Sequence, residues 1–302
     1  MLIKQRGELK VSFKEKWLAA VEQNNSVLCA GLDPAEFAMG RGKKGLPERV
    51  DKKSWSLAYV EAVAPYSAAL KPNVQYWKDA DDMAALAEIV ELSHRLGLVV
   101  IDDSKLADIG TTNDAGMYHS ANKGFDAVTI APYAGNMDEA TIQGQTRGLG
   151  VITMVLMSNA EYAQEKNMLV SLDDMFKTYD QRDLVLRTGD QFFTKRFIHL
   201  AWQAGRNDLD GIVIGAPSPN NHINGEEIAA VRRYTGKQLV LLPGVGDQGG
   251  EAEAIWRHYN LDAVIVNVGR ELMFPQGSSS TREDHQAAAK QYQEMLNALR
   301  GV

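Results

Sequence analysis

The stretch from Val99 to Thr112 reads VVIDDSKLADIGTT, and in it an apolar run passes directly into a charged one. A short β-branched run such as Val99–Ile101 is typical of a parallel strand that is buried on both faces. Seven further runs of this kind occur along the chain, at Val27–Leu32, Ala68–Leu70, Ala127–Ile130, Val151–Leu156, Gly211–Ile214, Leu239–Leu242 and Ala263–Val266.

Segments with helical periodicity separate these runs. Asp82–Leu96 carries one apolar stripe, made of Met83, Leu86, Ile89, Val90 and Leu96. Further helices are predicted at Thr194–Ala204, Gly249–Tyr259, Ala287–Leu299 and Phe13–Gln23, the last opened by a Ser12–Glu15 capping box.

Eight strands that alternate with helices predict an α/β fold, a single (β/α)₈ TIM barrel domain over residues 1–302 with an extra N-terminal helix. The alternative is an open, doubly wound sheet with additional strands. The longest gap, Ser158 to Gln191, predicts an extended loop after strand five. It carries apolar residues at helical spacing, which favours a short helix there: Met168, Leu169, Leu172, Met175 and Phe176.

Composition narrows the function classes. The chain has 302 residues, a formal net charge of −7 and one cysteine, Cys29. The acidic balance argues against nucleic-acid binding, and one cysteine allows neither an internal disulfide nor a cysteine-based zinc site. No histidine shows metal-ligand spacing, so we expect no metal. Without a signal peptide or an apolar run of about 18 residues, we expect a cytoplasmic protein with no membrane contact.

Charged side chains follow the first three predicted strands: Asp33, Lys71, Asp103, Lys105 and Asp108. The carboxyl ends of barrel strands form the active-site face, and strand alternation puts Asp103 and Lys105 on one side. Carboxylates near a lysine keep it protonated, which suits a proton donor or an electrostatic stabiliser. The alternative is that these charges lie in solvated loops.

Glycines follow the last two strands. Gly244, Gly246, Gly249 and Gly250 come after strand seven, and Gly269-Arg270 after strand eight. Glycine turns and helix N-termini at these strands commonly bind phosphate, and an arginine adds a bidentate contact. The alternative is a set of ordinary left-handed turns. The sequence has no Walker A motif and no GxGxxG after the first strand, so no nucleotide cofactor is predicted.

Together these motifs resemble the orotidine 5′-monophosphate decarboxylases, in particular their longer bacterial branch. Asp103–Thr112 resembles the family's DxKxxD signature, which related hexulose-phosphate synthases share. Further family motifs occur in the same order, at Gly31–Pro34, Leu70–Pro72, Asp126–Thr129, Pro132-Tyr133, Met157–Asn159, Leu242–Gly250 and Gly269-Arg270. The resemblance covers about Val27 to Met273.

The resemblance implies decarboxylation of orotidine 5′-monophosphate to UMP in de novo pyrimidine biosynthesis, without cofactor or metal. It implies a catalytic set of Lys71, Asp103, Lys105 and Asp108, with Lys105 protonating C6 of the carbanion. It also implies a homodimer in which Asp108, Ile109 and Thr112 reach the neighbour's site. The substrate-binding residues would be Asp33, Lys71 and Thr112 at the ribose, Ser158 at the pyrimidine, Pro243 near the carboxylate, and Gln248, Gly249, Gly269 and Arg270 at the phosphate.

Two positions depart from the family pattern. Leu106 stands where the longer branch often has arginine, and Asn73 where other branches have histidine. Two other functions remain open. One is a magnesium-dependent aldolase of the hexulose-phosphate synthase type, which would stabilise an enediolate. The other is a non-catalytic sensor of a phosphorylated ligand. Ser158-Asn159 and Gln248 favour the decarboxylase, and a sensor would not need a proton donor such as Lys105.

Overall fold

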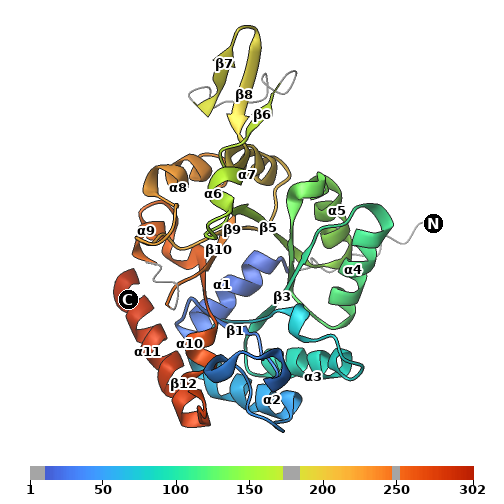
Figure 1. Cartoon of the computed structure of the whole chain (residues 1–302), viewed down its shortest axis with the longest axis vertical. Helices are drawn as coiled ribbons and strands as arrows, with labels where there is room; N and C mark the ends of the chain where they lie inside the picture. Colours follow the sequence, from blue (N-terminus) through green and yellow to red (C-terminus); the bar gives the residue numbers. More distant parts are fainter. Residues whose placement is uncertain (1–10, 173–183, 247–251) are drawn as a thin grey trace, which may run out of the picture.

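The computed structural model describes residues 11–172, 184–246 and 252–302. Eight parallel strands close into a barrel in the order β1-β11-β10-β9-β5-β4-β3-β2 (Figure 1). Because β1 pairs with both β2 and β11, the predicted barrel is confirmed and the open sheet is excluded. The strands are β1 (Leu28–Leu32), β2 (Ala69–Pro72), β3 (Val99–Leu106), β4 (Ala127–Ile130), β5 (Gly150–Leu156), β9 (Gly211–Ile214), β10 (Leu239–Pro243) and β11 (Val264–Val268).

Helices surround the barrel and bury one face each. They are α2 (Lys52–Val63), α3 (Asp82–Arg95), α4 (Gly110–Asn122), α5 (Met137–Arg147), α7 (Arg196–Arg206), α8 (Gly225–Arg232), α9 (Glu253–Trp256), α10 (Arg270–Met273) and α11 (Arg282–Arg300). Helix α3 buries Leu86, Ile89 and Val90 as predicted, but Met83 in its first turn is 47% exposed. Helix α9 is shorter than predicted, and residues 249–251 of that prediction lie outside the described residues.

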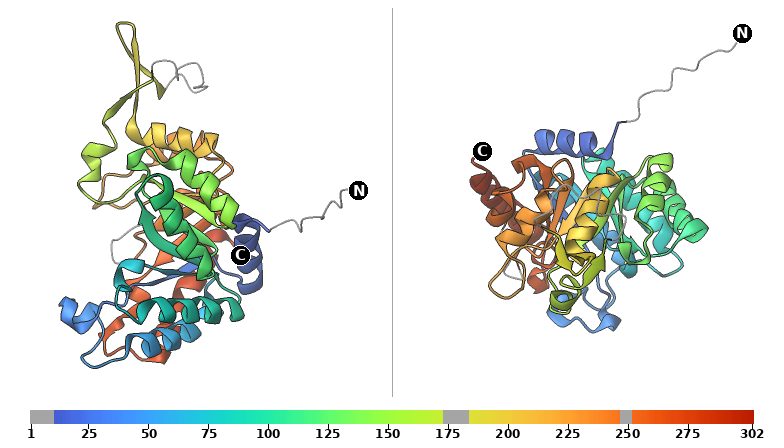
Figure 2. Two further views of the ribbon diagram at one scale, coloured as in Figure 1. Left: turned by 90° about the vertical axis from the view of Figure 1, so that its right-hand side faces the viewer. Right: turned by 90° about the horizontal axis from the view of Figure 1, so that it is seen from above.

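Helix α1 (Phe13–Asn24) covers the amino ends of the barrel strands. Its capping box between Ser12 and Glu15 is present as predicted. The Phe13 side chain packs directly against Gly150, the first residue of β5. A Cβ at Gly150 would lie only 2.5 Å from the Phe13 Cβ. Lys16 pairs with Asp126 at 2.8 Å, just before β4. Since α1 closes this end, the carboxyl ends of the strands form the accessible end of the barrel (Figure 2).

The extended segment after β5 is confirmed, but its structure differs from the prediction. It contains α6 (Tyr162–Glu165) and a three-stranded antiparallel sheet of β6 (Leu169–Ser171), β7 (Leu186–Thr188) and β8 (Gln191–Lys195). This sheet projects from the barrel (Figures 1 and 2). The helix predicted from Met168 onward is therefore wrong at β6, where pairing with β8 satisfies the backbone groups. Met175 and Phe176 lie outside the described residues.

Candidate active site

Three of the predicted charged residues meet at the carboxyl end of the barrel. Lys71 in β2 hydrogen-bonds one carboxylate oxygen of Asp103, and the Lys105 Nζ donates to the other at 2.5 Å. The Lys71 and Asp103 side chains are 7% and 9% exposed, whereas that of Lys105 is 41% exposed. Asp103 therefore holds two lysines at fixed positions, and only Lys105 presents much of its surface outward.

The backbone at Lys105 is bent to make this contact. Its φ is +49°, in the left-handed region that non-glycine residues rarely adopt, and the pairing of β3 with β4 shifts register between Asp102 and Leu106. The Lys105 N–H donates to Thr129 Oγ1 at 2.9 Å, and that hydroxyl donates to Asp103 Oδ1 at 3.0 Å. Thr129 thus holds both residues. The sequence reasoning missed this role, although a hydroxyl within the otherwise apolar Ala127–Ile130 run was a usable signal.

Charge and burial set the protonation states of the cluster. Burial alone would raise the pKa of the Asp103 carboxyl, but the adjacent Lys71 and Lys105 hold that pKa well below its usual range. Burial alone would lower the pKa of Lys71, but the carboxylates of Asp103 and Asp33 raise it above its ordinary value. At neutral pH the cluster therefore contains an ionised Asp103 and a protonated Lys71.

Asp33 follows β1 and faces the same cluster. Burial raises the pKa of its carboxyl, an effect that the nearby Lys71 opposes. Its Oδ1 is buried and accepts no hydrogen bond from the described residues. An ionised carboxylate that is buried with one oxygen lacking a hydrogen bond costs folding free energy. The same oxygen is available to a hydroxyl group of a ligand.

Two cavities adjoin the cluster. The first, which we call the polar chamber, has a volume of about 240 Å³ and is lined by Asp33, Lys71, Asn73, Asp103, Lys105, Pro243, Gly244, Val245, Asn267, Gly269, Arg270 and Glu271. The second, which we call the apolar chamber, has about 200 Å³ and is lined by Lys71, Asp103, Lys105, Thr129, Met154, Met157, Ser158, Asn159, Val213, Leu241 and Pro243. The residues common to both are the three charged ones and Pro243. The charged cluster thus lies at the junction of a polar and an apolar compartment.

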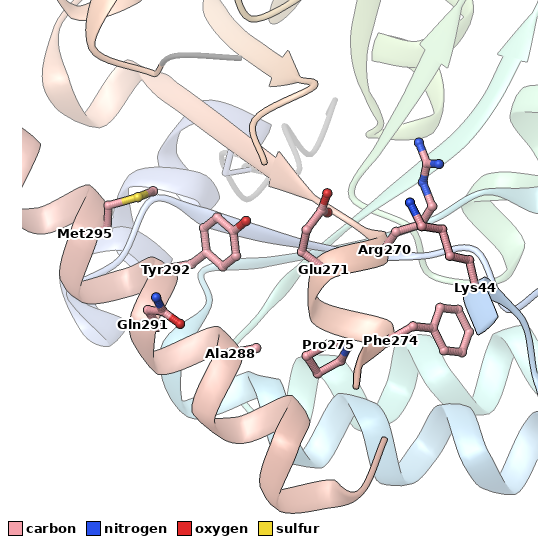
Figure 3. A pocket seen from close by; sticks show the side chains of 9 residues that line it. All are labelled: Lys44, Arg270, Glu271, Phe274, Pro275, Ala288, Gln291, Tyr292 and Met295. Carbon is pink, nitrogen blue, oxygen red and sulfur yellow. The ribbon is translucent and has the colours of Figure 1, made fainter. Parts of the chain in front are cut away.

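A third cavity of about 420 Å³ continues from the polar chamber past Arg270 and Glu271 to α11. Figure 3 shows Glu271 on α10 and Tyr292 on α11 extending into the space between these two helices. Gly246, with φ +97°, lies against this wall, because a Cβ there would be 2.6 Å from the Tyr292 hydroxyl. The predicted turn residues Gln248, Gly249 and Gly250 lie outside the described residues.

Asp108, Ile109 and Thr112 are not part of this cluster. All three are exposed, Ile109 to 58%, and none of them lines either chamber of the described chain. An oxygen of the Asp108 carboxylate accepts the N–H of Ile109 at 2.8 Å, and the Asp108 carbonyl accepts from Asn136 at 2.9 Å. The structure thus brings Lys71, Asp103 and Lys105 together within one chain, and the fourth predicted catalytic residue, Asp108, lies outside this cluster.

Residues 11–172, 184–246 and 252–302 contain neither a candidate metal cluster nor a candidate membrane-spanning helix. No group of three or more histidine, cysteine or carboxylate side chains there could hold a metal ion. None of the helices in this part is long and apolar enough to cross a membrane. Cys29 is buried in β1.

Known proteins resemble this chain in sequence and in fold. Residues 26–292 match the model of the family described as Orotidine 5′-phosphate decarboxylase / HUMPS family. An orotidine 5′-phosphate decarboxylase of Halorubrum lacusprofundi is 31% identical, over 96% of this chain and 100% of that protein. One of Ralstonia pickettii is 29% identical, over 95% and 99%. The solved OMP decarboxylase of Leishmania donovani has a similar fold, with a TM-score of 0.70 at 23% identity over 97% of this chain and 100% of that one.

Proposed function

The chain belongs to the orotidine 5′-phosphate decarboxylase / HUMPS family, and from this premise we propose how it decarboxylates orotidine 5′-monophosphate. The enzyme is a carboxy-lyase of pyrimidine biosynthesis, and Lys105 is its proton donor. The observation that carries this proposal is the position of Asp103 between Lys71 and Lys105, where the two chambers meet.

The reaction breaks the bond between C6 and the carboxylate carbon, which leaves as CO₂. The electron pair stays on C6, and the Lys105 Nζ–H supplies the proton that completes UMP. Lys105 then recovers a proton from water. Lys71 and Lys105, held by Asp103, stabilise the developing negative charge without reorganising. Residues of the chain supply both the field and the proton, so the proposal needs no metal or cofactor.

The two chambers suit the two ends of the nucleotide. Met154, Met157 and Leu241 give the apolar chamber walls against which a pyrimidine can pack, and Ser158 supplies a polar contact. Asp33 and Lys71 in the polar chamber suit ribose hydroxyls, and Pro243 borders both chambers near the position of the carboxylate. Gly269 and Arg270 lie at the far end and suit the phosphate, as does the turn with Gln248 and Gly249.

The exposed Asp108, Ile109 and Thr112 support a homodimer. They lie outside this chain's own chambers, so in our proposal they complete the site of a second copy. We also propose that residues 1–302 act as one barrel domain. A cytoplasmic location fits the reduced, buried Cys29.

The activity is tested by following the absorbance change of orotidine 5′-monophosphate with purified protein and excess chelator. We expect conversion to UMP with no metal or nucleotide added. Folded protein that gives no turnover would overturn the proposal. Turnover of a sugar phosphate that requires Mg²⁺, without affinity for UMP, would indicate the aldolase instead.

The shared site is tested by co-expressing Lys105→Ala with Asp108→Ala. Each variant alone should be nearly inactive. Mixed dimers contain one intact site, so the mixture should recover about one quarter of the wild-type activity. No recovery, with mixed dimers demonstrated by differential tags, would contradict an Asp108 that acts in the neighbour's site.

A further inference from the structure

Ser158 and Asn159 line the apolar chamber but belong to no helix or strand. Their position depends on contacts with other elements. The Asn159 carbonyl accepts two hydrogen bonds, from the Tyr162 N–H at 3.1 Å and from the Nε2 of His222 at 3.0 Å. His222 lies in the loop that follows β9, so this bond ties the end of β5 to a segment 63 residues away.

Lys166 fixes His222 in turn. Its Nζ donates to the His222 carbonyl at 2.6 Å and pairs with Glu227 of α8 at 2.5 Å. The Lys166 and Glu227 side chains are 5% and 13% exposed, and Glu227 also completes the capping box of α8. The Lys166 N–H bonds to the Tyr162 carbonyl at 2.9 Å. These hydrogen bonds therefore connect the loop after β5 to the loop after β9 at two points, Asn159 and Lys166.

Gly215 holds Ser158 from the other side. A Cβ at Gly215 would lie 2.7 Å from the Ser158 Cβ and 2.9 Å from its backbone nitrogen. Ser158 thus lies directly on the end of β9, and its neighbour Asn159 is held by His222. This arrangement leaves the Ser158 side chain little freedom to move relative to the chamber.

We propose that His222, held by Lys166 and Glu227, is a positioning residue that sets Ser158 for recognition of the pyrimidine. This inference rests on the proposed function, because it assigns the apolar chamber to the base. His222 touches neither the reacting carbon nor the phosphate end in this proposal. Its loss should therefore weaken recognition of the base and leave recognition of the ribose phosphate unchanged.

The test compares three substitutions of His222 by calorimetric titration with UMP and with ribose 5-phosphate, which lacks the base. His222→Gln places an amide N–H near the position of Nε2, whereas His222→Asn is too short to reach Asn159 and His222→Leu has no donor. We expect Leu and Asn to weaken UMP binding about tenfold, with ribose 5-phosphate unchanged, and Gln to bind UMP like the wild type. The KM for orotidine 5′-monophosphate should rise in parallel, with kcat within about threefold.

His258→Leu is the matched control, since His258 is a half-buried histidine that lines neither chamber. It should bind both ligands like the wild type. Equal weakening of both ligands in His222→Leu, or UMP affinity that does not distinguish Gln from Asn and Leu, would overturn the inference. A wild-type protein that neither binds UMP nor turns over substrate would instead contradict the proposed function itself.

Discussion

Two partly buried clusters of lysine and carboxylate differ in whether a carboxylate or a lysine is the shared partner. At the barrel mouth, one carboxylate, that of Asp103, is shared by Lys71 and Lys105. At the first residue of α2, Lys52 is shared by Asp82 and Glu36, each at 2.8 Å, and also donates to the Tyr76 carbonyl at 3.0 Å. The Lys52 side chain is 12% exposed and lies 5.1 Å from the centre of the Trp77 ring.

The difference teaches that burial and pairing alone do not make a reactive lysine. Lys52 donates its hydrogen bonds to two carboxylates and a backbone carbonyl. In the described part of the chain it lines neither chamber. Lys105 shares its carboxylate with another cation and borders both chambers. An ammonium group that borders an open cavity can stabilise a carbanion there, whereas a lysine surrounded by carboxylates and a carbonyl stabilises the fold.

The largest expected effect comes from Lys105→Ala. Losing both the proton donor and half of the positive charge should lower kcat at least about 10³-fold, while UMP still binds. The measurement is turnover together with UMP titration, and Lys52→Ala serves as the matched lysine control, with kcat expected to remain near wild type. Comparable losses in the two variants would remove the distinction between the clusters.

Asp103→Asn should come next, because it removes the carboxylate that is hydrogen-bonded to the buried Lys71. We expect the free energy of unfolding to fall by about 3–5 kcal/mol at pH 7. Since the folded-state pKa of Asp103 lies below its unfolded value of about 3.9, its contribution is present above about pH 4 and is lost as pH falls further. Urea unfolding of the wild type should therefore lose stability below about pH 4 more steeply than the variant. Parallel pH curves would contradict a strongly held Asp103 charge.

Lys52→Met should destabilise less, by about 2 kcal/mol, because the Glu36 side chain it leaves behind is 37% exposed and can be hydrated. The buried Asp82 carboxylate keeps the hydrogen bond from the Asp79 N–H at 2.7 Å. The midpoint in urea should fall, and kcat of the folded protein should match the wild type. A drop in kcat at full folding would mean that this cluster also serves the reaction.

Asp33→Asn should have the smallest effect on stability, and in the opposite direction. Because the pKa of Asp33 is raised on folding, its ionisation costs stability as pH rises above its unfolded value of about 3.9. Removing the charge should raise the free energy of unfolding by roughly 0.5–2 kcal/mol and weaken UMP binding. Thermal melts at pH 7, with and without UMP, measure both changes. A variant that is less stable than the wild type would contradict the cost assigned to this carboxylate.

The sequence predicted the barrel and the meeting of Lys71, Asp103 and Lys105, because both follow from local pattern. Buried parallel strands leave a continuous apolar run, and their carboxyl ends share one face. The sheet formed by β6, β7 and β8 was missed, since strand pairing between Leu169 and Lys195 leaves no periodic signal in a short apolar segment. Contacts across many residues, such as that of His222 with Asn159, depend on how two loops pack and are equally invisible in the sequence.

The projecting sheet also bears on how the chain can vary in length. Leu169 faces Lys195 across the first pair of β6 and β8, so the chain leaves the barrel and returns to it at nearly the same point. The entropy lost in closing a loop grows only with the logarithm of its length. Residues added or removed beyond this pair therefore change the closure cost by a fraction of a kcal/mol for modest changes in length. The segment between Leu169 and Lys195 is therefore a suitable place to insert a reporter peptide or to open new chain termini, because the pairing of β5 with β9 is kept.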